Sequence, residues 1–246
     1  NRVVFRDDPV NGPNHLKEAG KPIGHQNRYL AVGNYETIDD VFNNAQTGSI
    51  NSVAPGQVVP GDFIYIDFDS NGILNGQDKV AVDELNYPLH TYGLNLGFDW
   101  KGLSFSAMFY APTGVYKLVN SVYSASFKSG KINAQPDVMN AWTPETANTS
   151  GVRAPALHLT NDGAFNGTES TYRYQNFSYL RLKTMELGYN LPKKWLKTVG
   201  LKSLQVYVTG NNLLTWWGGD DRIDPEGEQA KYAILRSFTS GVRVSF

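Results

Sequence analysis

The sequence contains no cysteine, and this absence excludes two kinds of stabilisation. Neither a disulfide framework nor a cysteine-ligated zinc site can form. A charge of one sign is lacking as well, because 22 basic and 23 acidic residues leave a net charge of -1. No basic block is present, so we expect no nucleic acid as a partner. No apolar run reaches the roughly 18 residues of a transmembrane helix, and none is predicted.

Aromatic residues and glycine, in contrast, are abundant. The 246 residues include 14 Tyr, 12 Phe, 5 Trp and 24 Gly. This composition favours strands and turns over helices. Two short helices are nevertheless predicted. One begins after Thr37, which can cap it and would place Ile38, Val41 and Phe42 on one face. The other lies between Pro192 and Gly200.

Several segments alternate apolar and polar residues with the period of two that is typical of β-strands. In TYGLNLGFDW, residues 91–100, every second side chain is aromatic or leucine. Lys101 and Gly102 then form a two-residue hairpin turn, which makes Trp100 and Leu103 cross-strand partners. The five predicted strands are 91–100, 103–111, 179–190, 203–214 and 234–246, and a sixth is expected around Arg28–Tyr35.

The predicted strand 179–190 changes the parity of its apolar positions. Leu180 and Leu182 share one parity, whereas Met185 and the apolar residues after it have the other. A β-bulge near Lys183 would explain the change. The alternative is that the far end of this strand stands clear of the apolar zone.

The periodicity is compatible with two folds. In a water-soluble sandwich the apolar face points inward, whereas in a transmembrane barrel it meets lipid. Three features favour the barrel. The strands have about the 9–11 residues of a tilted bilayer crossing, aromatic residues lie at strand ends, and short connections alternate with long ones. The alternative is a secreted calcium-binding all-β domain for adhesion or glycan binding, whose apolar faces would form its core.

Six motifs occur in order along residues 18–246: PGDFIYIDFDSNGILNGQDK, YPLHTYGLNLGFDWKGLSFSAMFY, AWTPE, SYLRLKTMELGYNLPKKWLKTVGLKSLQVYVTGNNLLTW, DPEGE and SGVRVSF. In this order they resemble the C-terminal portion of SusC/RagA-type TonB-dependent outer-membrane transporters. The TonB box, the plug domain and the early barrel strands of that family have no counterpart in the sequence. We therefore expect the chain to be about the last quarter of such a protein.

The resemblance implies an all-β fold, an antiparallel transmembrane barrel of about 22 strands with long extracellular loops. It implies import across the outer membrane rather than catalysis. The expected ligand is an oligosaccharide or an oligopeptide, captured with a SusD-type surface lipoprotein, and the energy comes through the TonB complex. The other expected partners are the remainder of the barrel and plug, and outer-membrane lipid.

The resemblance also divides the chain. Residues 1–90 are expected to hold an early strand and an extracellular loop. Residues 91–246 are expected to hold the C-terminal barrel strands, with the connections 112–178 and 215–233 outside the cell. Strand 234–246 should pair with 203–214 along one edge and with a strand from the remainder of the barrel along the other.

The segment DFDSNGILNGQDK, residues 67–79, matches the spacing of a calcium-binding loop. The predicted ligands are Asp67, Asp69, Asn71, the carbonyl of Ile73, and Asp78. Gly72 stands at the sharp turn. The last ligand is an aspartate where a glutamate is usual, so its shorter side chain need not reach with both oxygens. The alternative is a metal-free Asp/Asn/Gly turn held by side-chain-to-backbone hydrogen bonds. No organic cofactor is expected.

No catalytic constellation is found in the sequence. The four histidines have no ligand spacing, and they are His15, His25, His90 and His158. Asp224 and Glu226 are interpreted as solvated loop charges rather than a glycosidase pair. Loop aromatics could stack on sugar rings, but packing within the loops is the commoner role. These aromatics are Tyr116, Tyr123, Tyr172 and Trp217.

Overall fold

The computed structural model describes residues 2–10, 12–43, 58–119, 139, 141–147, 154–158, 166–219, 222–227, 232 and 234–246. The chain divides into two compact units, and each consists of two segments. The first unit combines Asn1–Asn86 with Lys117–Gln175, and the second combines Tyr87–Tyr116 with Asn176–Phe246. A different division is predicted from the sequence, into an early strand and extracellular loop up to residue 90 and the C-terminal barrel strands from residue 91. That division stays a prediction.

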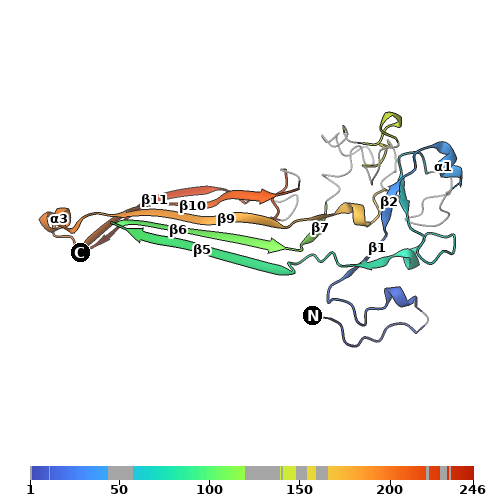
Figure 1. The fold of residues 1–246 in the computed structure, drawn as a ribbon, viewed down its shortest axis with the longest axis horizontal. Helices are drawn as coiled ribbons and strands as arrows, with labels where there is room; N and C mark the ends of the chain where they lie inside the picture. Colours follow the sequence, from blue (N-terminus) through green and yellow to red (C-terminus); the bar gives the residue numbers. More distant parts are fainter. Residues whose placement is uncertain are drawn as a thin grey trace. The chain divides into compact units, whose positions relative to one another are not determined.

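The second unit contains a five-stranded antiparallel sheet in the order β11-β10-β9-β6-β5 (Figure 1). Its strands are β5 (His90–Trp100), β6 (Leu103–Thr113), β9 (Tyr179–Asn190), β10 (Ser203–Trp217) and β11 (Ser237–Ser245). All five predicted strands are confirmed, with small changes at their ends. Trp100 pairs with Leu103, which confirms the predicted hairpin.

A β-bulge causes the parity change in β9. The pairing with β6 passes from Met108–Thr184 directly to Phe109–Leu182, so Lys183 is the extra residue. The bulge predicted near Lys183 is therefore confirmed. It lets apolar residues of both parities along β9 lie on the same face of the sheet.

The neighbouring strand β10 has a second irregularity at the same level. Its pairing with β9 jumps from Asn211 to Leu214, and Asn212 has φ = 53°, in the left-handed region. A Cβ on Gly210 would lie 2.6 Å from Leu213 Cδ2. Gly210 thus leaves the space into which Leu213 folds back, and Leu213 is buried there.

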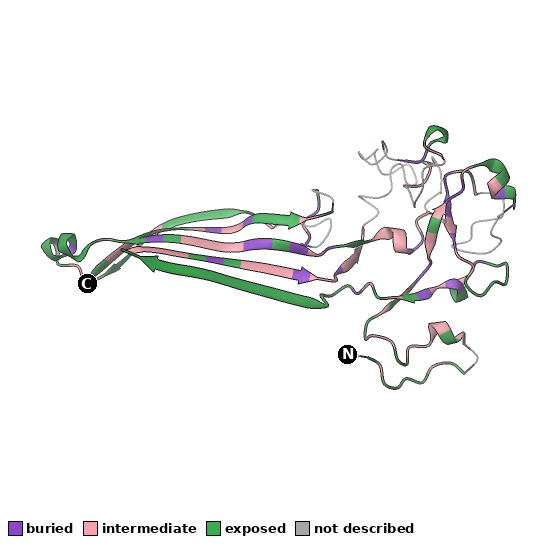
Figure 2. Cartoon of the chain, viewed as in Figure 1, coloured by how far each residue is buried: buried purple, intermediate pink, exposed green. Residues whose placement is uncertain are grey.

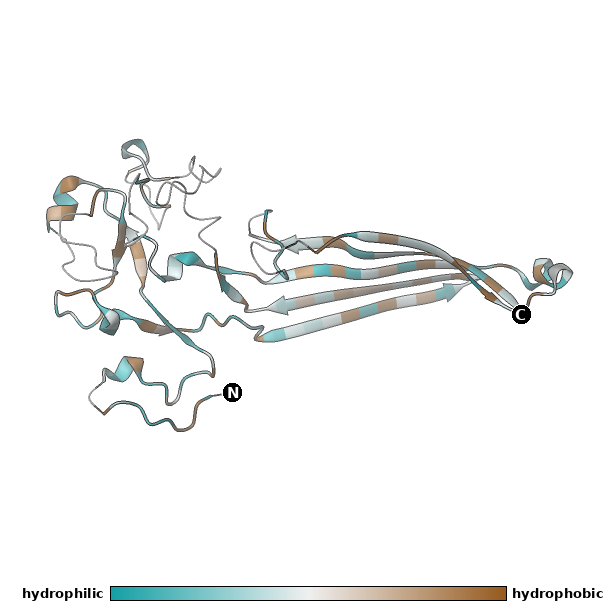
Figure 3. Cartoon of the chain, turned by 180° about the vertical axis from the view of Figure 1, so that it is seen from behind, coloured by the Kyte–Doolittle hydropathy of each residue, from teal (hydrophilic) through white to brown (hydrophobic). Residues whose placement is uncertain are grey.

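The sheet has one apolar and one polar face. The cross-strand row Leu96, Ala107, Met185, Gly210, Phe238 belongs to the apolar face. The next row, Gly97, Ser106, Glu186, Thr209, Thr239, belongs to the polar face. Figure 3 shows this alternation as bands along the strands.

Most of the apolar face is not covered by described residues, although Leu213 packs against Ala107 and Leu182 on it. Leu96 is 49% exposed and Val206 is 45% exposed, and β5 is exposed along its whole length (Figure 2). Neither side chain is packed in an interior formed by the described residues, and contact of both with lipid stays a prediction. A water-soluble sandwich would have buried them.

Both outer edges of the sheet lack a partner strand within the described residues. As predicted, β11 pairs with β10 along one edge, and β5 pairs with β6. The described strands therefore form an open sheet and not a closed barrel. Among the residues that the structure describes, no helix has the length and apolar character to cross a membrane.

The β9–β10 connection contains the second predicted helix. It consists of α3 (Lys193–Leu196) and the 3-10 turn η8 (Lys197–Val199). Pro192 precedes it, and Gly200 ends it with φ = 72°. Leu196 is buried, but Trp195 is 63% exposed. The apolar spacing of this segment predicts Trp195 and Leu196 on one side of the helix, and this is wrong, because adjacent helical residues point in different directions.

The first unit contains short elements. They are η1 (Asn14–Leu16), β1 (Gln26–Arg28), β2 (Ala31–Asn34), α1 (Ile38–Asn43), β3 (Phe63–Tyr65), η3 (Gly76–Asp78), β4 (Val80–Val82), η6 (Pro144–Thr146) and η7 (Thr171–Arg173). β1 pairs with β4 and β2 pairs with β3, while β7 (Tyr116–Leu118) pairs with β8 (Tyr174–Asn176).

The single strand predicted around Arg28–Tyr35 is wrong, because two strands form there. Between them, Tyr29 donates its N–H to the Glu169 carbonyl at 3.4 Å, and the Leu30 carbonyl accepts from Ile66 at 3.1 Å. The two halves therefore pair with different distant segments, and neither joins the five-stranded sheet.

A small apolar core stabilises the first unit. It is formed by Tyr29, Phe63, Tyr65 and Leu74. In α1, the Thr37 hydroxyl accepts the Asp40 N–H at 3.0 Å, which confirms the predicted cap. Of the three apolar residues expected on one face of α1, only Val41 is buried. A helix of six residues has too few turns to bury a longer stripe.

Candidate functional site

The segment 67–79 brings three carboxylates together in the first unit. One oxygen each of Asp67, Asp69 and Asp78 lies within 4.8 Å of the others. Three like charges at this distance repel one another, and a cation among them would offset the repulsion. Within the described residues this is the one group of three metal-ligating side chains. The four histidines form no such group there.

Backbone hydrogen bonds hold Asp67 in place. Its oxygens accept the N–H of Gly72 at 2.7 Å and of Asn71 at 3.2 Å. Gly72 has φ = 78°, which explains the glycine at this turn. Desolvation acts to raise the pKa of Asp67, but these hydrogen bonds outweigh it and lower that pKa. The carboxylate is thus kept ionised, as a metal ligand must be.

Asp78 has a role in the turn itself. Its oxygens accept the N–H of Phe68 at 2.9 Å and of Asn75 at 2.7 Å. It also closes the capping box of η3 with Asn75. The hydrogen-bonded turn that was the metal-free alternative is therefore present. Each carboxylate oxygen has two lone pairs, so these bonds leave capacity for a cation.

Asn71 and Ile73 belong to the same hydrogen-bonded turn. The Asn71 side-chain oxygen accepts the Ile73 N–H at 2.7 Å, and the Ile73 carbonyl accepts from the Asn75 side chain at 3.0 Å. Asn71 Nδ2 donates to Asp69 at 2.9 Å. The donor set of carboxylate and carbonyl oxygens is the one that calcium takes.

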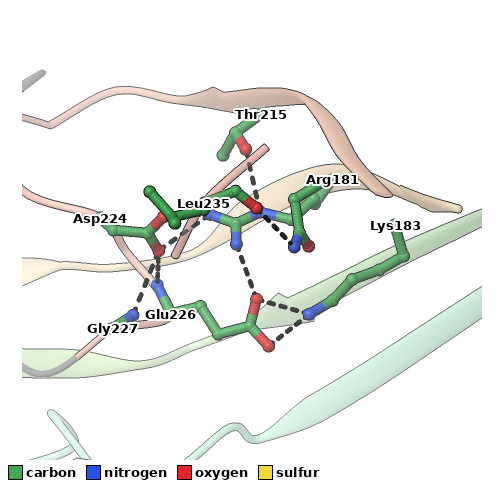
Figure 4. Close-up of polar contacts among 8 residues, drawn as sticks. Arg181, Lys183, Thr215, Asp224, Glu226, Gly227 and Leu235 are labelled. Atoms are coloured by element: carbon green, nitrogen blue, oxygen red, sulfur yellow. Dashed lines mark hydrogen bonds and ion pairs between the residues drawn. The ribbon is translucent and has the colours of Figure 1, made fainter. Parts of the chain in front are cut away.

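A second polar cluster lies in the second unit, and the sequence analysis missed its centre. Arg181 of β9 is only 1% exposed. Its guanidinium donates to both oxygens of Asp224 at 2.8 and 2.9 Å, and to Glu226 at 2.8 Å (Figure 4). Its Nε donates to Thr215 at 2.9 Å. Lys183 donates to Glu226 at 2.6 Å. The cluster joins the loop 222–227 to two strands.

The interpretation of Asp224 and Glu226 as solvated charges is therefore wrong. Asp224 also accepts the backbone N–H of Glu226 at 2.9 Å and of Gly227 at 3.1 Å. Desolvation acts to raise the pKa of Asp224, but Arg181 and these two donors outweigh it and lower that pKa. The available signal was an arginine between two leucines in an apolar strand, because such a charge needs a partner.

Along the polar face, side chains of four strands bond to one another. Arg243 of β11 donates to Glu186 of β9 at 2.8 and 3.1 Å, and to Gln205 of β10 at 2.8 Å. Thr209 donates to Glu186 at 2.9 Å, and Gln205 donates to Ser104 of β6 at 3.1 Å. Part of the hydrogen-bonding capacity of the polar face is thus used by bonds within the sheet.

Two of the loop aromatics pack within their own unit. The ring of Tyr172 lies 4.5 Å from that of Phe63, and the ring of Trp217 lies 5.1 Å from that of Phe177. Packing, the commoner role, is confirmed for these two. Tyr123 lies outside the described residues.

No family model matches the chain, but two proteins of Formosa agariphila are similar to it. TonB-dependent receptor P3 is 30% identical over 206 residues, which is 78% of this chain and 20% of the relative. TonB-dependent receptor P26 is 30% identical over 210 residues, which is 76% of this chain and 20% of the relative. This chain is part of a TonB-dependent receptor. It spans about a fifth of the length of these relatives.

Solved structures show the same fold. The RagAB peptide importer in the open-open state has a TM-score of 0.63 and 24% identity, over 93% of this chain and 23% of that one. The RagAB peptide transporter has a TM-score of 0.63 and 22% identity, over 95% and 24%. The predicted resemblance to the SusC/RagA type is confirmed. The receptor's five-stranded sheet is a portion of a transmembrane barrel, and the receptor is located in the outer membrane.

Proposed function

We propose that the receptor containing this chain imports oligosaccharides or oligopeptides across the outer membrane in a TonB-dependent manner. The chain supplies part of the barrel wall and of the outer loops. One observation carries this proposal: a sheet with an exposed apolar face and an internally bonded polar face, in a chain similar to TonB-dependent receptors over 78% of its length. Similarity in fold to a peptide importer supports oligopeptides as one of the two ligand classes.

The proposed partners are the remainder of the barrel and plug, a SusD-type lipoprotein and the TonB complex. The open edges of β5 and β11 support the first of these. An unpaired backbone group in hydrocarbon costs several kcal/mol, so each edge needs a further strand. The lipoprotein would cover the barrel on the side of the long loops, and the TonB complex would act from the other side. No catalytic role is proposed.

Growth on defined nutrients tests the import proposal. A strain that lacks the gene should fail to grow on one class of oligomer, while growth on the corresponding monomers stays normal. Inactivation of TonB should reproduce the defect. Normal growth of the deletion strain on every oligosaccharide and oligopeptide that the wild type uses would contradict the proposal. Recovery of the protein from the medium without detergent would instead favour the secreted calcium-binding domain.

We also propose that the segment 67–79 binds calcium. The three converging carboxylates support this site, and so does the low pKa of Asp67. The shorter Asp78 and its backbone bonds predict a weak site, which extracellular calcium concentrations could still fill.

Metal analysis of the purified receptor after dialysis against calcium tests this site. The variant Asp67→Asn/Asp69→Asn should retain about one calcium ion fewer per chain than the wild type. The exposed Asp83→Asn is the matched control and should change nothing. Hydrogen exchange at Gly72 should slow when calcium is added to the wild type. Equal metal content in all three proteins would leave the metal-free turn as the correct interpretation.

A further inference from the structure

Several lysine residues lie at one end of the five-stranded sheet. The 101–102 turn, the 191–202 connection and the last residues of the chain meet there (Figure 1). Asn190 donates its N–H to the Gly102 carbonyl at 2.7 Å, and Lys202 donates its N–H to the Ser245 carbonyl at 2.9 Å. We call the cationic residues of this end the lysine rim. They are Lys101, Lys193, Lys194, Lys197 and Lys202.

The lysine rim is exposed and is not neutralised within the described residues. All five side chains are exposed, and none of them forms an ion pair with a described carboxylate. The 191–202 connection contains no acidic residue. It joins β9 to β10, which are flanked by β6 and β11, so further strands at the sheet edges would not cover it.

The cations at the other end of the same strands, in contrast, have carboxylate partners. There, Arg181 and Lys183 are matched by the acidic pair Asp224 and Glu226. Within the described residues, the cations at one end of the sheet are thus paired with carboxylates, and the five at the other end are not. An excess of positive charge in one place indicates an anionic partner from outside the chain.

Aromatic side chains indicate the chemistry of that partner. Trp100 and Trp195 are each 63% exposed, and Phe246 is 80% exposed. Lys101 Nζ lies 4.9 Å from the Trp100 ring centroid. Exposed tryptophan with lysine beyond it is typical of the depth at which a bilayer changes from hydrocarbon to headgroups, because the ring is amphipathic and the long cationic chain reaches outward. The apolar face of the sheet leads directly to this level.

We propose that the lysine rim binds the phosphate groups of anionic phospholipids in the leaflet at this end of the barrel, with Trp195 and Trp100 among the headgroups. A cluster of four to eight or so lysines beside a membrane-spanning element is a recognised determinant of anionic lipid binding. The proposal rests on the transmembrane sheet and not on the transported ligand.

The full-length receptor in nanodiscs of equal parts phosphatidylglycerol and phosphatidylcholine tests this proposal. Mass spectrometry of the intact receptor released from the discs gives the ratio of the two retained lipids. Wild type should retain an excess of phosphatidylglycerol. The variant Lys193→Gln/Lys194→Gln/Lys197→Gln should reduce that excess at least about threefold, because each lysine near the surface contributes to the attraction.

Three controls make the result specific. The corresponding Lys→Arg triple variant keeps the charge and should keep the excess. Lys17→Gln/Lys79→Gln removes charge from the first unit and should also keep it. Trp195→Ala should reduce the retention of both lipids at this end. Heat-modifiable migration in electrophoresis confirms that each variant is folded.

An unchanged phosphatidylglycerol excess in the Lys→Gln triple variant would overturn the proposal. Loss of the excess in the Lys→Arg variant would overturn it as well, because charge would then not be the basis of lipid retention. If the triple variant instead loses an acidic periplasmic protein while its lipid ratio stays normal, the rim binds protein and the proposal is wrong. Transport is not a readout, so failure of the import proposal would leave this result intact.

Discussion

The two compact units treat their apolar side chains in opposite ways. The first unit buries Phe63 and Tyr65 completely, and it pairs its buried Arg28 with Glu84. The second unit leaves Leu96 half exposed while its buried charge, Arg181, lies on the polar side. Each arrangement is the stable one in a different surrounding. The first suits water on all sides, and the second suits lipid on one face of a sheet.

The difference shows that the exposure of an apolar side chain has to be interpreted together with the medium, water or lipid, that surrounds it. An exposed apolar stripe across several strands would be an aggregation hazard in water. In a bilayer the same stripe contacts the lipid chains, and its apolar surface is removed from water by lipid instead of by protein. The comparison between the units can be tested by substitutions that are harmful in one surrounding and harmless in the other.

The largest effect is expected from Phe63→Ala in the core of the first unit. Removal of a fully buried ring should cost about 3–5 kcal/mol, from lost transfer energy and the cavity that remains. Native-state hydrogen exchange of the β2 and β3 amides measures this local loss. Phe42→Ala, at a 77% exposed position of α1, is the matched control. It should cost less than about 0.5 kcal/mol. Equal effects would mean that the first unit has no core of its own.

In the second unit, Leu96→Arg should cost about 2–4 kcal/mol if Leu96 lies near the bilayer midplane, because the cation enters hydrocarbon. Asn95→Arg, one residue away on the opposite face, should cost much less. Chemical denaturation of the receptor refolded in lipid vesicles measures both. If the two substitutions cost the same, the faces of β5 do not differ in their surroundings.

Arg181→Met breaks the cluster that joins the loop 222–227 to the sheet. We expect a local loss of about 2 kcal/mol, since Asp224 loses its cation while partly exposed to solvent. Faster proteolysis or hydrogen exchange of the loop, with β9 itself unchanged, measures it. Thr215→Val removes only one hydrogen bond of the Arg181 guanidinium and leaves its two carboxylate partners, so it should have a smaller effect. Global unfolding of the barrel by Arg181→Met would contradict a local role.

The same cluster predicts a dependence on pH. The pKa of Asp224 in the folded protein lies below its ordinary value of 3.8. The stabilisation is therefore fully present above 3.8, and it is lost as the pH falls through the lower, folded pKa. Protection of the loop should be constant from neutral pH to mild acid and decline only below that value. A decline between pH 7 and 5 would point to another group.

The smallest effect is expected from Thr37→Ala, which removes the cap of α1. The cost should be about 1 kcal/mol, because one backbone N–H loses its acceptor at an exposed site. Thr37→Ser keeps the hydroxyl and should restore most of it. Amide exchange at Asp40 reports the change directly. No increase in that exchange would show that water replaces the cap without loss.

The strands and their faces could be predicted from sequence because a period of two is a local property. The bulge at Lys183 was predictable for the same reason, since it changes the parity within one strand. The convergence of Asp67, Asp69 and Asp78 follows from their spacing around Gly72. Such features depend on residues that are close together in the chain.

The features that escaped prediction depend on distant residues. Arg181 meets Asp224 across a separation that no local pattern encodes. The segment 28–35 divides into two strands because its pairing partners lie elsewhere in the first unit. The pairing of Asp62 with His158 at 2.6 Å was also unforeseen. In each case the partner is distant in the sequence and is brought close only by the tertiary fold.

The bulge at Lys183 has a consequence for how reliably the barrel assembles. In a regular ladder without the extra residue, Arg181 and Lys183 would share the parity of Met185 and face hydrocarbon. Each cation there would cost roughly 2–4 kcal/mol near the midplane. A slip by one residue would in addition move the other side chains of the strand to the opposite face of the sheet. Arg181 and Lys183 thus disfavour, during folding, the β9 register that lacks the bulge, because that register would place both cations in hydrocarbon.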